Sequence, residues 1–351
     1  LTDFGQGLAV DLVNNWVDDL VTLSRSGVNI VIVSSGAVAE GMVRLGMSTR
    51  PKSVHLLQAA AAVGQMGLIQ LYESSFQRHG LHTAQILLTH DDLRSRERYL
   101  NARSTLRDLL SLGVIPVVNE NDTVVTDEIR FGDNDTLAAL VANLIEADSL
   151  LLLTDQKGLY SSDPRTNAHA ELVTEVKASN RQLDKMAGTS SSLGRGGMVT
   201  KIAAARVAAR SGANTLIISG KETGIISKIS QGVVSGTLIT ADQEVIDSRK
   251  QWLATLAPRG SLVLDAGAVD VLRDSGRSLL PVGVTSAAGE FTRGDMVSCC
   301  DQDGAEIARG LVNYNLAETK KIIGKSSDKI EECLGYLGDD ELIHRDNLVL
   351  V

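Results

Sequence analysis

The sequence predicts an α/β protein with a mostly parallel, open sheet sandwiched by helices, followed by a small, mainly β domain. Three observations support this fold class. Short apolar runs alternate with helix-length amphipathic segments over about the first 240 residues, which is the order of parallel strands joined by helices. Polar or small residues follow several of the runs directly. From about residue 258, short strand-like runs and Gly-rich turns replace the alternation.

In the first domain, apolar residues at helical spacing predict a helix over residues 10–26, and a buried strand follows at 29–34. A doubly wound domain needs a strand before its first helix, so we expect a strand and a loop to be missing ahead of residue 10. The same patterns predict further helices, at 56–79, 98–112, 136–144 and 202–209, and further strands, at 83–88, 115–118, 149–153, 215–219 and 236–240.

The expected domain limits are 1–245 for the α/β domain, 246–257 for a polar linker and 258–351 for the second domain. Within the second domain we expect strands at 261–264 and 296–299, and helices at 266–273 and near 316–323. Residues 256–351 contain 10 Lys and Arg against 16 Asp and Glu, so this module carries −6 of the total net charge of −9. Such a charge argues against a general nucleic-acid binder, because phosphate contacts need clustered Lys and Arg.

The composition is that of a globular protein, with 43% hydrophobic and 22% charged residues among 351. No run approaches the roughly 18 apolar residues of a membrane span, and the start has no signal-peptide pattern. The three cysteines, Cys299, Cys300 and Cys333, lack metal-ligand spacing and fit a reducing compartment. We therefore expect a cytoplasmic protein that makes no contact with a membrane.

Residues 115–147 hold the strongest sign of a binding site. The strand at 115–118 is followed by Asn119-Glu120-Asn121-Asp122, and a second polar cluster, Gly132 to Asp135, precedes the next helix. Ligands of open α/β sheets bind at such strand ends, helix starts favour anions, and asparagine amides can donate to a carboxylate. Helix capping and turn formation would explain Asp133 or Asn134, but they explain four polar residues after a strand less well.

Two other segments have the form of anion sites. Residues 34–37 (SSGA) turn from a strand directly into a helix, which is either a phosphate-type site or a plain tight connection. Residues 189–201 are rich in Gly and end at Lys201, so mobile backbone and a lysine could approach phosphates, although the spacing is not that of a P-loop. The alternative is a surface loop followed by an ordinary helix lysine. The six histidines form no metal pattern.

Taken together, these motifs resemble the amino-acid kinase family over nearly the whole chain. The resemblance rests on residues 30–41, 87–106, 118–124, 132–139, 151–165 and 194–201, and the C-terminal module resembles a PUA domain. It implies the amino-acid kinase fold and the ATP-dependent phosphorylation of the side-chain carboxylate of L-glutamate to L-glutamyl 5-phosphate, the first step of proline biosynthesis. It also implies ATP and Mg²⁺ as cofactors, proline as a feedback inhibitor and a homo-oligomer, a dimer or tetramer.

The resemblance also implies roles for individual residues. Lys201 would stabilise the transferring phosphate, and Asp135 would organise the active-site lysines. The glutamate-binding positions would be Ser35, Asn119, Asp122 and Asn134. The nucleotide-binding positions would be Thr154, Asp155, Arg195, Gly196, Gly197, Met198, Val199, Thr200 and Lys201. Two departures from the family pattern stand out. Nothing here matches the family's N-terminal lysine and Gly-Thr-Ser turn, and Arg195 stands where the family usually has threonine.

The chemistry implied by the resemblance agrees with these residue types. A carboxylate acceptor is already ionised at neutral pH and needs no general base, so catalysis reduces to positioning and charge neutralisation by Lys and Mg²⁺. Two alternatives remain at this stage. One is another family member, such as an acetylglutamate, aspartate or uridylate kinase. The other is an RNA-binding protein using Lys321, Lys325 and Lys329 as a stripe on one helix, although the module's net charge of −6 favours a solvated helix face.

Overall fold

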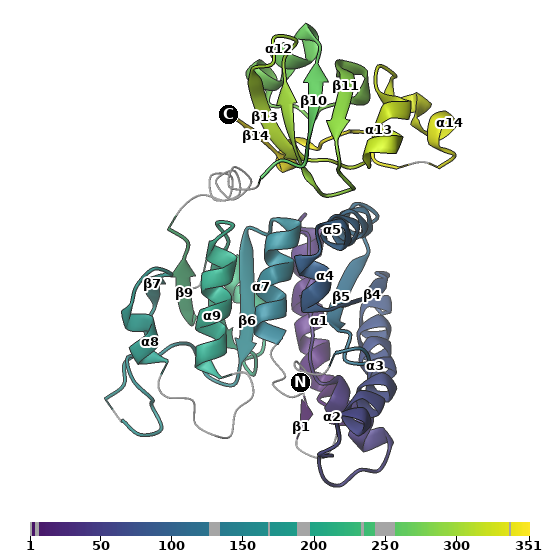
Figure 1. The fold of residues 1–351 in the computed structure, drawn as a ribbon. Coiled ribbons are helices and arrows are strands. Elements are labelled where there is room, and N and C mark those ends of the chain that lie inside the picture. The colour runs from purple at the N-terminus through teal and green to yellow at the C-terminus, as the bar shows by residue number, and fades with distance from the viewer. Residues whose placement is uncertain are drawn as a thin grey trace. The chain divides into compact units, whose positions relative to one another are not determined.

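The computed structural model describes residues 2–3, 7–125, 134–167, 169–187, 197–232, 235–242, 257–336 and 338–351. By its contacts, the chain divides into two compact units (Figure 1). The first unit contains Leu1–Asp91 and Arg103–Val245, and the second contains Asp92–Ala102 and Ile246–Val351. The first unit is built of alternating strands and helices, and the second is mainly β. This confirms the predicted fold class.

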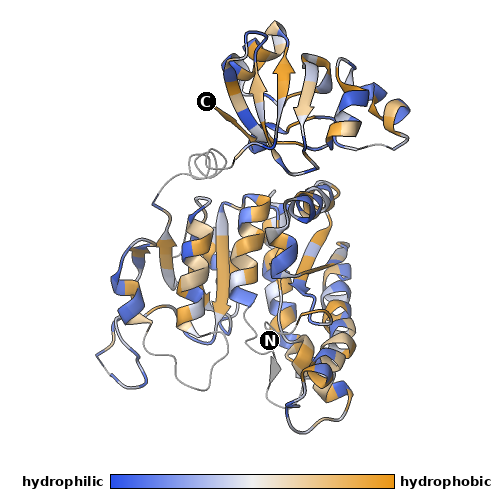
Figure 2. Cartoon of the chain, viewed as in Figure 1, coloured by the Kyte–Doolittle hydropathy of each residue, from blue (hydrophilic) through white to orange (hydrophobic). Residues whose placement is uncertain are grey.

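Two sheets form the centre of the first unit. In the first sheet β3, β5 and β4 lie side by side and all run parallel. In the second sheet β6 is parallel to β8, whereas β9 runs antiparallel to β8 and parallel to β7. Figure 2 shows β6 as hydrophobic along most of its length, as expected of a strand covered on both faces. The strands are β3 (Ile32–Val33), β4 (Thr83–Leu88), β5 (Ile115–Glu120), β6 (Ser149–Thr154), β7 (Glu175–Lys177), β8 (Asn214–Ser219) and β9 (Thr237–Thr240).

Helices pack against these sheets and bury an apolar core. α1 is fixed by a buried hydrogen bond from Trp16 Nε1 to the carbonyl oxygen of Gly220, 2.8 Å away. Asp19 of the same helix accepts hydrogen bonds from the backbone of Ile226 and the hydroxyl of Ser227, which lie in α10. The helices are α1 (Val10–Arg25), α2 (Ala37–Arg44), α3 (Val54–Gln77), α4 (His90–Arg94), α5 (Arg96–Ser111), α7 (Asn134–Ile145), α8 (Gln182–Met186), α9 (Met198–Ala209) and α10 (Ile225–Ser230). A short antiparallel pair, β1 (Thr2–Asp3) and β2 (Gly7–Leu8), precedes α1.

α2 and α3 approach each other so closely that their backbones touch. A Cβ atom at Gly64 would lie 1.8 Å from the carbonyl oxygen of Ala37, and one at Gly41 would lie 1.7 Å from that of Ala60. Only glycine fits at both positions, because the atoms that a side chain would meet belong to the partner helix's backbone. α2 is therefore held rigidly, and with it the turn that precedes α2.

α3 bears on the expectation that the chain has no membrane span. Its 24 residues are long and apolar enough to cross a membrane by length and composition. The alanines that contribute to this apolar composition are small, and helices packed inside proteins pass the same test. In this structure Leu68, Tyr72 and Phe76 of α3 lie in the core with residues of α1, so the length and composition alone are weak evidence for a membrane span.

A buried ion pair joins α5 to the end of α7. Arg103, whose side chain is 4% exposed, lies 2.8 Å from Glu146, and Arg107 contacts the other carboxylate oxygen at 2.8 Å. Glu146 adopts a positive φ of 57°, a conformation that non-glycine residues rarely take. The two arginines therefore stabilise a strained backbone position where α7 ends.

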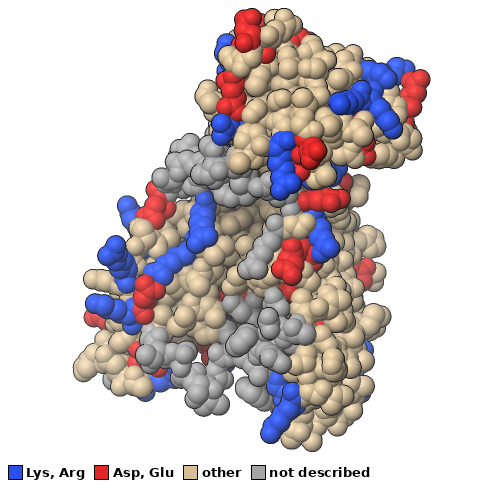
Figure 3. Space-filling view, in the orientation of Figure 1, with Lys and Arg blue, Asp and Glu red and all other residues tan. Residues whose placement is uncertain are grey.

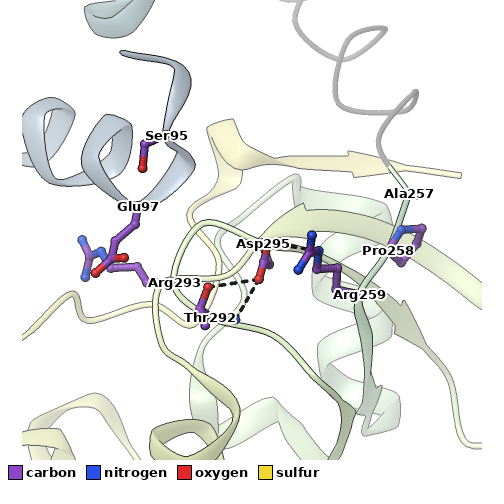
Figure 4. Close-up of a pocket in the computed structure, with 8 residues that line it drawn as sticks. All are labelled: Ser95, Glu97, Ala257, Pro258, Arg259, Thr292, Arg293 and Asp295. Atoms are coloured by element: carbon purple, nitrogen blue, oxygen red, sulfur yellow. Dashed lines mark hydrogen bonds and ion pairs between the residues drawn. The ribbon is translucent and has the colours of Figure 1, made fainter. Parts of the chain in front are cut away.

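The second unit is built on one five-stranded sheet in the order β11-β10-β12-β13-β14, in which only the pairing of β10 with β12 is parallel. Its apolar core includes the fully buried Tyr314. The turn before β12 is fixed by Asp295, which accepts hydrogen bonds from the backbone and hydroxyl of Thr292 and lies 3.7 Å from Arg259 (Figure 4). The elements are β10 (Gly260–Leu264), α12 (Ala266–Ser275), β11 (Val284–Gly289), β12 (Met296–Cys300), β13 (Glu306–Leu311), α13 (Leu316–Ile322), α14 (Ile330–Leu334) and β14 (Leu348–Leu350).

The predicted lysine stripe in this unit is wrong. α13 ends at Ile322, and Gly324 with φ of 72° turns the chain away from the helix axis. Lys325 and Lys329 therefore lie beyond the helix, where Lys325 Nζ contacts the sulfur of Cys333 and Lys329 pairs with Glu332. The i, i+4, i+8 spacing does not place these lysines on one helical face.

Candidate active site

The strand β5 carries two of the predicted polar residues into the protein interior. The sequence suggested that the strand ends at residue 118, but it continues through Asn119 and Glu120, which are 2% and 4% exposed. Both residues pair with β4, opposite Leu87 and Leu88. Buried polar side chains need hydrogen-bond partners. Asn119 is satisfied by its neighbours, since its Oδ1 accepts from the backbone N–H of Glu120 and its Nδ2 donates to Gln65 Oε1 at 2.8 Å.

Asn134, the first residue of α7, contacts the ends of two strands of the first sheet, β3 and β5. Its Nδ2 donates to the carbonyl oxygen of Ser34, just after β3, and to Asn119 Oδ1 at 2.8 Å. A carbonyl oxygen can only accept, so this contact fixes which end of the amide is the nitrogen. Both amide hydrogens are then used within the protein. The sequence suggested that Asn134 donates to a substrate carboxylate, whereas this geometry offers a ligand the acceptor Oδ1.

The turn between β3 and α2 lies beside these amides. The backbone N–H of Ser34 donates to Val118 of β5 at 2.9 Å, and the buried Ser34 hydroxyl contacts Tyr72 of α3 at 3.2 Å. Burial raises the pKa of the Tyr72 hydroxyl, and the hydrogen bond with Ser34 offsets only part of that rise. Gly36 has a φ of 97°, and Ser35 before it is exposed. The turn thus presents the Ser35 side chain to solvent, whereas Ala37, the first residue of α2, is buried.

A lysine and an aspartate meet at the starts of α7 and α9. Lys201 Nζ lies 2.9 and 3.1 Å from the two carboxylate oxygens of Asp135, and the side chains of the pair are 8% and 16% exposed. Thr200 Oγ1 donates to the same carboxylate at 2.7 Å. The sequence suggested that helix α9 begins near residue 202, but it begins at Met198, after Gly197. Lys201 therefore lies in the first turn, where helix N–H groups and a lysine can both face an anion.

The other predicted residues lie at the end of β6, at the start of α9 or outside the described part of the chain. Thr154 is the last residue of β6, and its hydroxyl donates to the exposed Asp155 at 3.2 Å. Gly197, Met198 and Val199 form the start of α9. The predictions for Arg195 and Gly196 fall outside the described residues. Within the described residues, no group of three or more His, Cys, Asp and Glu side chains could hold a metal ion.

Asp122 and the residues around it line a pocket of about 220 Å³ on the β4 side of β5. The structure also adds one buried residue, Gln65, that the sequence did not single out, and it places Glu120 of the predicted polar cluster inside the strand. Gln65 is part of an Ala-rich helix whose pattern indicates only packing, and Glu120 lies within a strand with its Oε2 3.5 Å from His90 Nδ1. No local motif marks Gln65, because its role depends on the long-range contact of α3 with β5.

Comparison with known proteins defines the class to which this fold and site belong. The model of the amino acid kinase family matches residues 3–219, and the model of the PUA domain matches residues 260–334. The first match covers more than half of the chain. The chain therefore belongs to the amino acid kinase family and carries a C-terminal PUA domain.

Curated relatives show which members of the amino acid kinase family are most similar in sequence to this chain among those compared. Proteins named glutamate 5-kinase align with 100% of this chain at 62% identity in Teredinibacter turnerae, 60% in Chromohalobacter salexigens and 61% in Thioalkalivibrio sulfidiphilus. The alignments cover 94%, 93% and 94% of those relatives. Within the amino acid kinase family, the chain groups with the glutamate 5-kinases.

Proposed function

We propose that this chain transfers the γ-phosphoryl group of ATP to the side-chain carboxylate of L-glutamate, forming L-glutamyl 5-phosphate for proline biosynthesis. The observation that supports this proposal most directly is the pair of adjacent residues that opens α7. Asn134 contacts the polar cluster of β3 and β5, and Asp135 contacts Lys201 at the start of α9. An amino-acid site and a phosphate site would then meet at one helix start, as in-line transfer requires.

The polarity of the amide groups suggests how glutamate is oriented. Asn134 offers Oδ1, and Asp122 offers a carboxylate, so both suit the α-ammonium group of an amino acid. Asn119 would act by holding Asn134, since its own amide is hydrogen-bonded to Gln65 and Glu120. Ser35 and the N–H groups at the start of α2 suit a carboxylate of the substrate.

On the phosphate side, Lys201 would neutralise charge that develops on the transferred group. Asp135 holds its ammonium in place before any nucleotide binds, which reduces the reorganisation needed during the reaction. Thr154, Asp155 and residues 195–200 would bind ATP. Mg²⁺ would be held mainly by the nucleotide phosphates, since the described residues provide no cluster of ligands for it and Mg²⁺ usually binds one or two carboxylates plus substrate phosphates.

Three further features belong to the same proposal. The enzyme would act in the cytoplasm as a homo-oligomer, and proline would inhibit it. Proline has an α-carboxylate and a cationic nitrogen but lacks the second carboxylate, so a site built for glutamate would accept it without completing the phosphate-facing arrangement. Competition follows from this view: raising the glutamate concentration should relieve inhibition by proline. Inhibition that glutamate cannot relieve would place the inhibitor elsewhere.

A coupled assay of ADP release with variants tests the two halves of the site separately. Asp122→Ala should raise the KM for glutamate by about 10- to 100-fold and change the KM for ATP little, because a charged hydrogen bond of roughly 1.5–3 kcal/mol is lost. Lys201→Ala should lower kcat by about 100-fold or more while glutamate still binds. Lys228→Ala is the control, since this lysine is 47% exposed and pairs only with Glu222 at the surface among the described contacts.

Two results would contradict the proposal. A kcat near that of the wild type in Lys201→Ala would show that this lysine has only a structural role and does not neutralise charge on the transferred group. A substrate panel in which N-acetylglutamate or aspartate reacts faster than glutamate would assign the chain to another member of the amino acid kinase family.

A further inference from the structure

Three side-chain amides between α3 and α7 form a chain of hydrogen bonds that ends at Asn134. Asn119 Nδ2 donates to Gln65 Oε1 at 2.8 Å, and Asn119 Oδ1 accepts from Asn134 Nδ2 at 2.8 Å. We call Gln65, Asn119 and Asn134 the amide relay. A side-chain amide carries its donor and its acceptor on different branches, so fixing one branch fixes the other. The orientation of each member therefore constrains that of the next.

Backbone groups fix the direction of the amide relay. The carbonyl oxygen of Ser34 requires Asn134 to present its nitrogen, and the backbone N–H of Glu120 requires Asn119 to present its oxygen. The nitrogen of Asn119 then points to Gln65, which must present its oxygen. At the other end, the acceptor Oδ1 is the branch that Asn134 has for a ligand.

Gln65 is well placed to hold Asn119. The residue before it, Gly64, lies where a Cβ would be 1.8 Å from the carbonyl oxygen of Ala37, so the backbone of α3 cannot shift toward α2 here. Residues 54–72 contain no Asp, Glu, Lys or Arg, and Figure 3 shows few charged side chains over α3. Gln65 and Asn119 are 8% and 2% exposed. Their hydrogen bond is shielded from water and from competing charges, which strengthens it.

Packing alone does not explain a glutamine at this position. Gln65 Nε2 is buried and has no hydrogen-bond partner among the described residues. An unsatisfied buried donor destabilises a fold, and methionine, an unbranched side chain of similar length, would avoid that loss. Polar residues that break such a rule are expected where function needs them. What Gln65 does provide is one acceptor, and it goes to Asn119.

We propose that Gln65 is a positioning residue that makes the substrate site selective for an ammonium group. Gln65 touches no substrate itself. By accepting from Asn119 Nδ2, it keeps Asn119 Oδ1 directed at Asn134, so that Asn134 offers the acceptor Oδ1 to the α-ammonium group of the amino acid. Without Gln65, the buried nitrogen of Asn119 loses an acceptor, and rotation of this amide releases Asn134. The inference rests on the proposed function, in which Asn134 binds the substrate.

Gln65→Met removes the acceptor and nearly keeps the length of the side chain. In the coupled assay, the KM for glutamate should rise about three- to tenfold, as expected for the loss of one buried hydrogen bond between neutral groups. The KM for ATP should stay unaltered. Glutarate has both carboxylates of glutamate but no ammonium group, so its Kd, measured by NMR titration, should change little. A general distortion of the site would weaken the binding of glutamate and glutarate alike, and that result would overturn the proposal.

A double-variant cycle shows whether Gln65 acts through Asn119. Asn119→Ala removes the middle of the amide relay and should itself raise the KM for glutamate. Adding Gln65→Met to this variant should raise the KM no further, because the contact that Gln65 controls is already absent. Effects of independent residues multiply instead. Multiplied increases in KM would show that Gln65 does not act through Asn119.

Ser75→Ala is the matched control, since Ser75 is another buried polar residue of α3, 2% exposed. Its hydroxyl contacts Asn14 and the carbonyl oxygen of Leu71, and it lies about 15 Å along the helix from Gln65. Ser75→Ala should lower the melting temperature and leave the KM for glutamate unaltered. An equal rise in KM in Ser75→Ala would assign the effect to a loosened α3. If Gln65→Met is too unstable to assay, Gln65→Asn, one methylene shorter, should raise the KM in the same way.

The amide relay also has a readout that needs no substrate. In ¹⁵N NMR spectra of the ligand-free full chain, the side-chain amide signal of Asn134, identified by its loss in Asn134→Ala, should shift in Gln65→Met and stay in place in Ser75→Ala. An Asn134 signal that Gln65→Met does not move would overturn the proposal even if glutamate is the substrate. If the signal shifts and the wild-type chain phosphorylates a different compound, the positioning of Asn134 by Gln65 stands and the proposed function fails.

Discussion

Gly64→Ala should destabilise the first unit although alanine is the better helix former. Gly64 lies inside α3, where the replacement gains about 1 kcal/mol in helix propensity. The new Cβ would lie 1.8 Å from the carbonyl oxygen of Ala37 and 2.4 Å from the nitrogen of Gly41. Even a contact of 3.0 Å requires α2 and α3 to separate by about 1.2 Å (3.0 − 1.8). Overpacking of this kind costs about 1–3 kcal/mol, and backbone atoms cannot rotate away, so the upper end applies.

The net expectation is a loss of about 2 kcal/mol in the free energy of unfolding, measured by guanidinium titration with circular dichroism. The matched control is Gly67→Ala, one turn later on the same helix. The three atoms nearest to its Cβ would all belong to the guanidinium of Arg44, a flexible side chain that is 41% exposed, so this variant should change stability little. Because Ala37 follows the turn of Ser35 and Gly36, Gly64→Ala should also raise the KM for glutamate. Equal stability of the two variants would refute the reasoning about backbone contact.

Two further predictions concern charges in the first unit. Burial raises the pKa of Glu73, but hydrogen bonds from the backbone and hydroxyl of Thr83, together with those from His82 and Gln77, outweigh burial and hold the pKa below the ordinary 4.5. Because the pKa of Glu73 is lower in the folded than in the unfolded protein, its ionised carboxylate contributes stability above the unfolded pKa, and this stability is lost as the pH falls through the folded pKa. Glu73→Gln should therefore flatten the fall in melting temperature between about pH 5 and pH 3. The control Glu175→Gln, at an exposed residue, should leave this fall unchanged. Glu146→Ala should cost about 3–5 kcal/mol, because it removes the carboxylate that pairs with the buried Arg103; an unfolding midpoint close to that of the wild type would show that other contacts of this arginine suffice.

The regular elements were largely predictable because each repeats a local pattern. The strand at Thr83–Leu88 and the start of α1 at Val10 lie where apolar periodicity put them. The errors fall where tertiary contacts override that pattern. β5 continues through Asn119 and Glu120 because Gln65 and β4 provide partners for polar residues that would otherwise end a buried strand.

The contacts within the candidate site were only partly predictable from the sequence. Lys201 and Asp135 were identified as a functional pair by resemblance, and their contact at 2.9 Å depends on the packing of α7 against α9, which no local pattern reveals. The direction of the Asn134 amide could not be predicted, since it is set by a carbonyl oxygen 100 residues earlier in the chain. Gln65 has no local signal for the same reason.

The start of α7 fixes the distance between two sets of contacts, those of Asn134 and those of Asp135. Asn134 belongs to the hydrogen bonds of the three-stranded sheet, and Asp135 belongs to those of α9 beside the four-stranded sheet. One peptide unit joins them, and it keeps their Cα atoms about 3.8 Å apart. Thermal motion of one sheet relative to the other therefore cannot separate the two contact sets at this point. The spacing of the two contact sets is therefore fixed by covalent geometry. Any redesign that moves the contacts of Asn134 or of Asp135 by one residue along α7 would rotate them by about 100° around the helix axis.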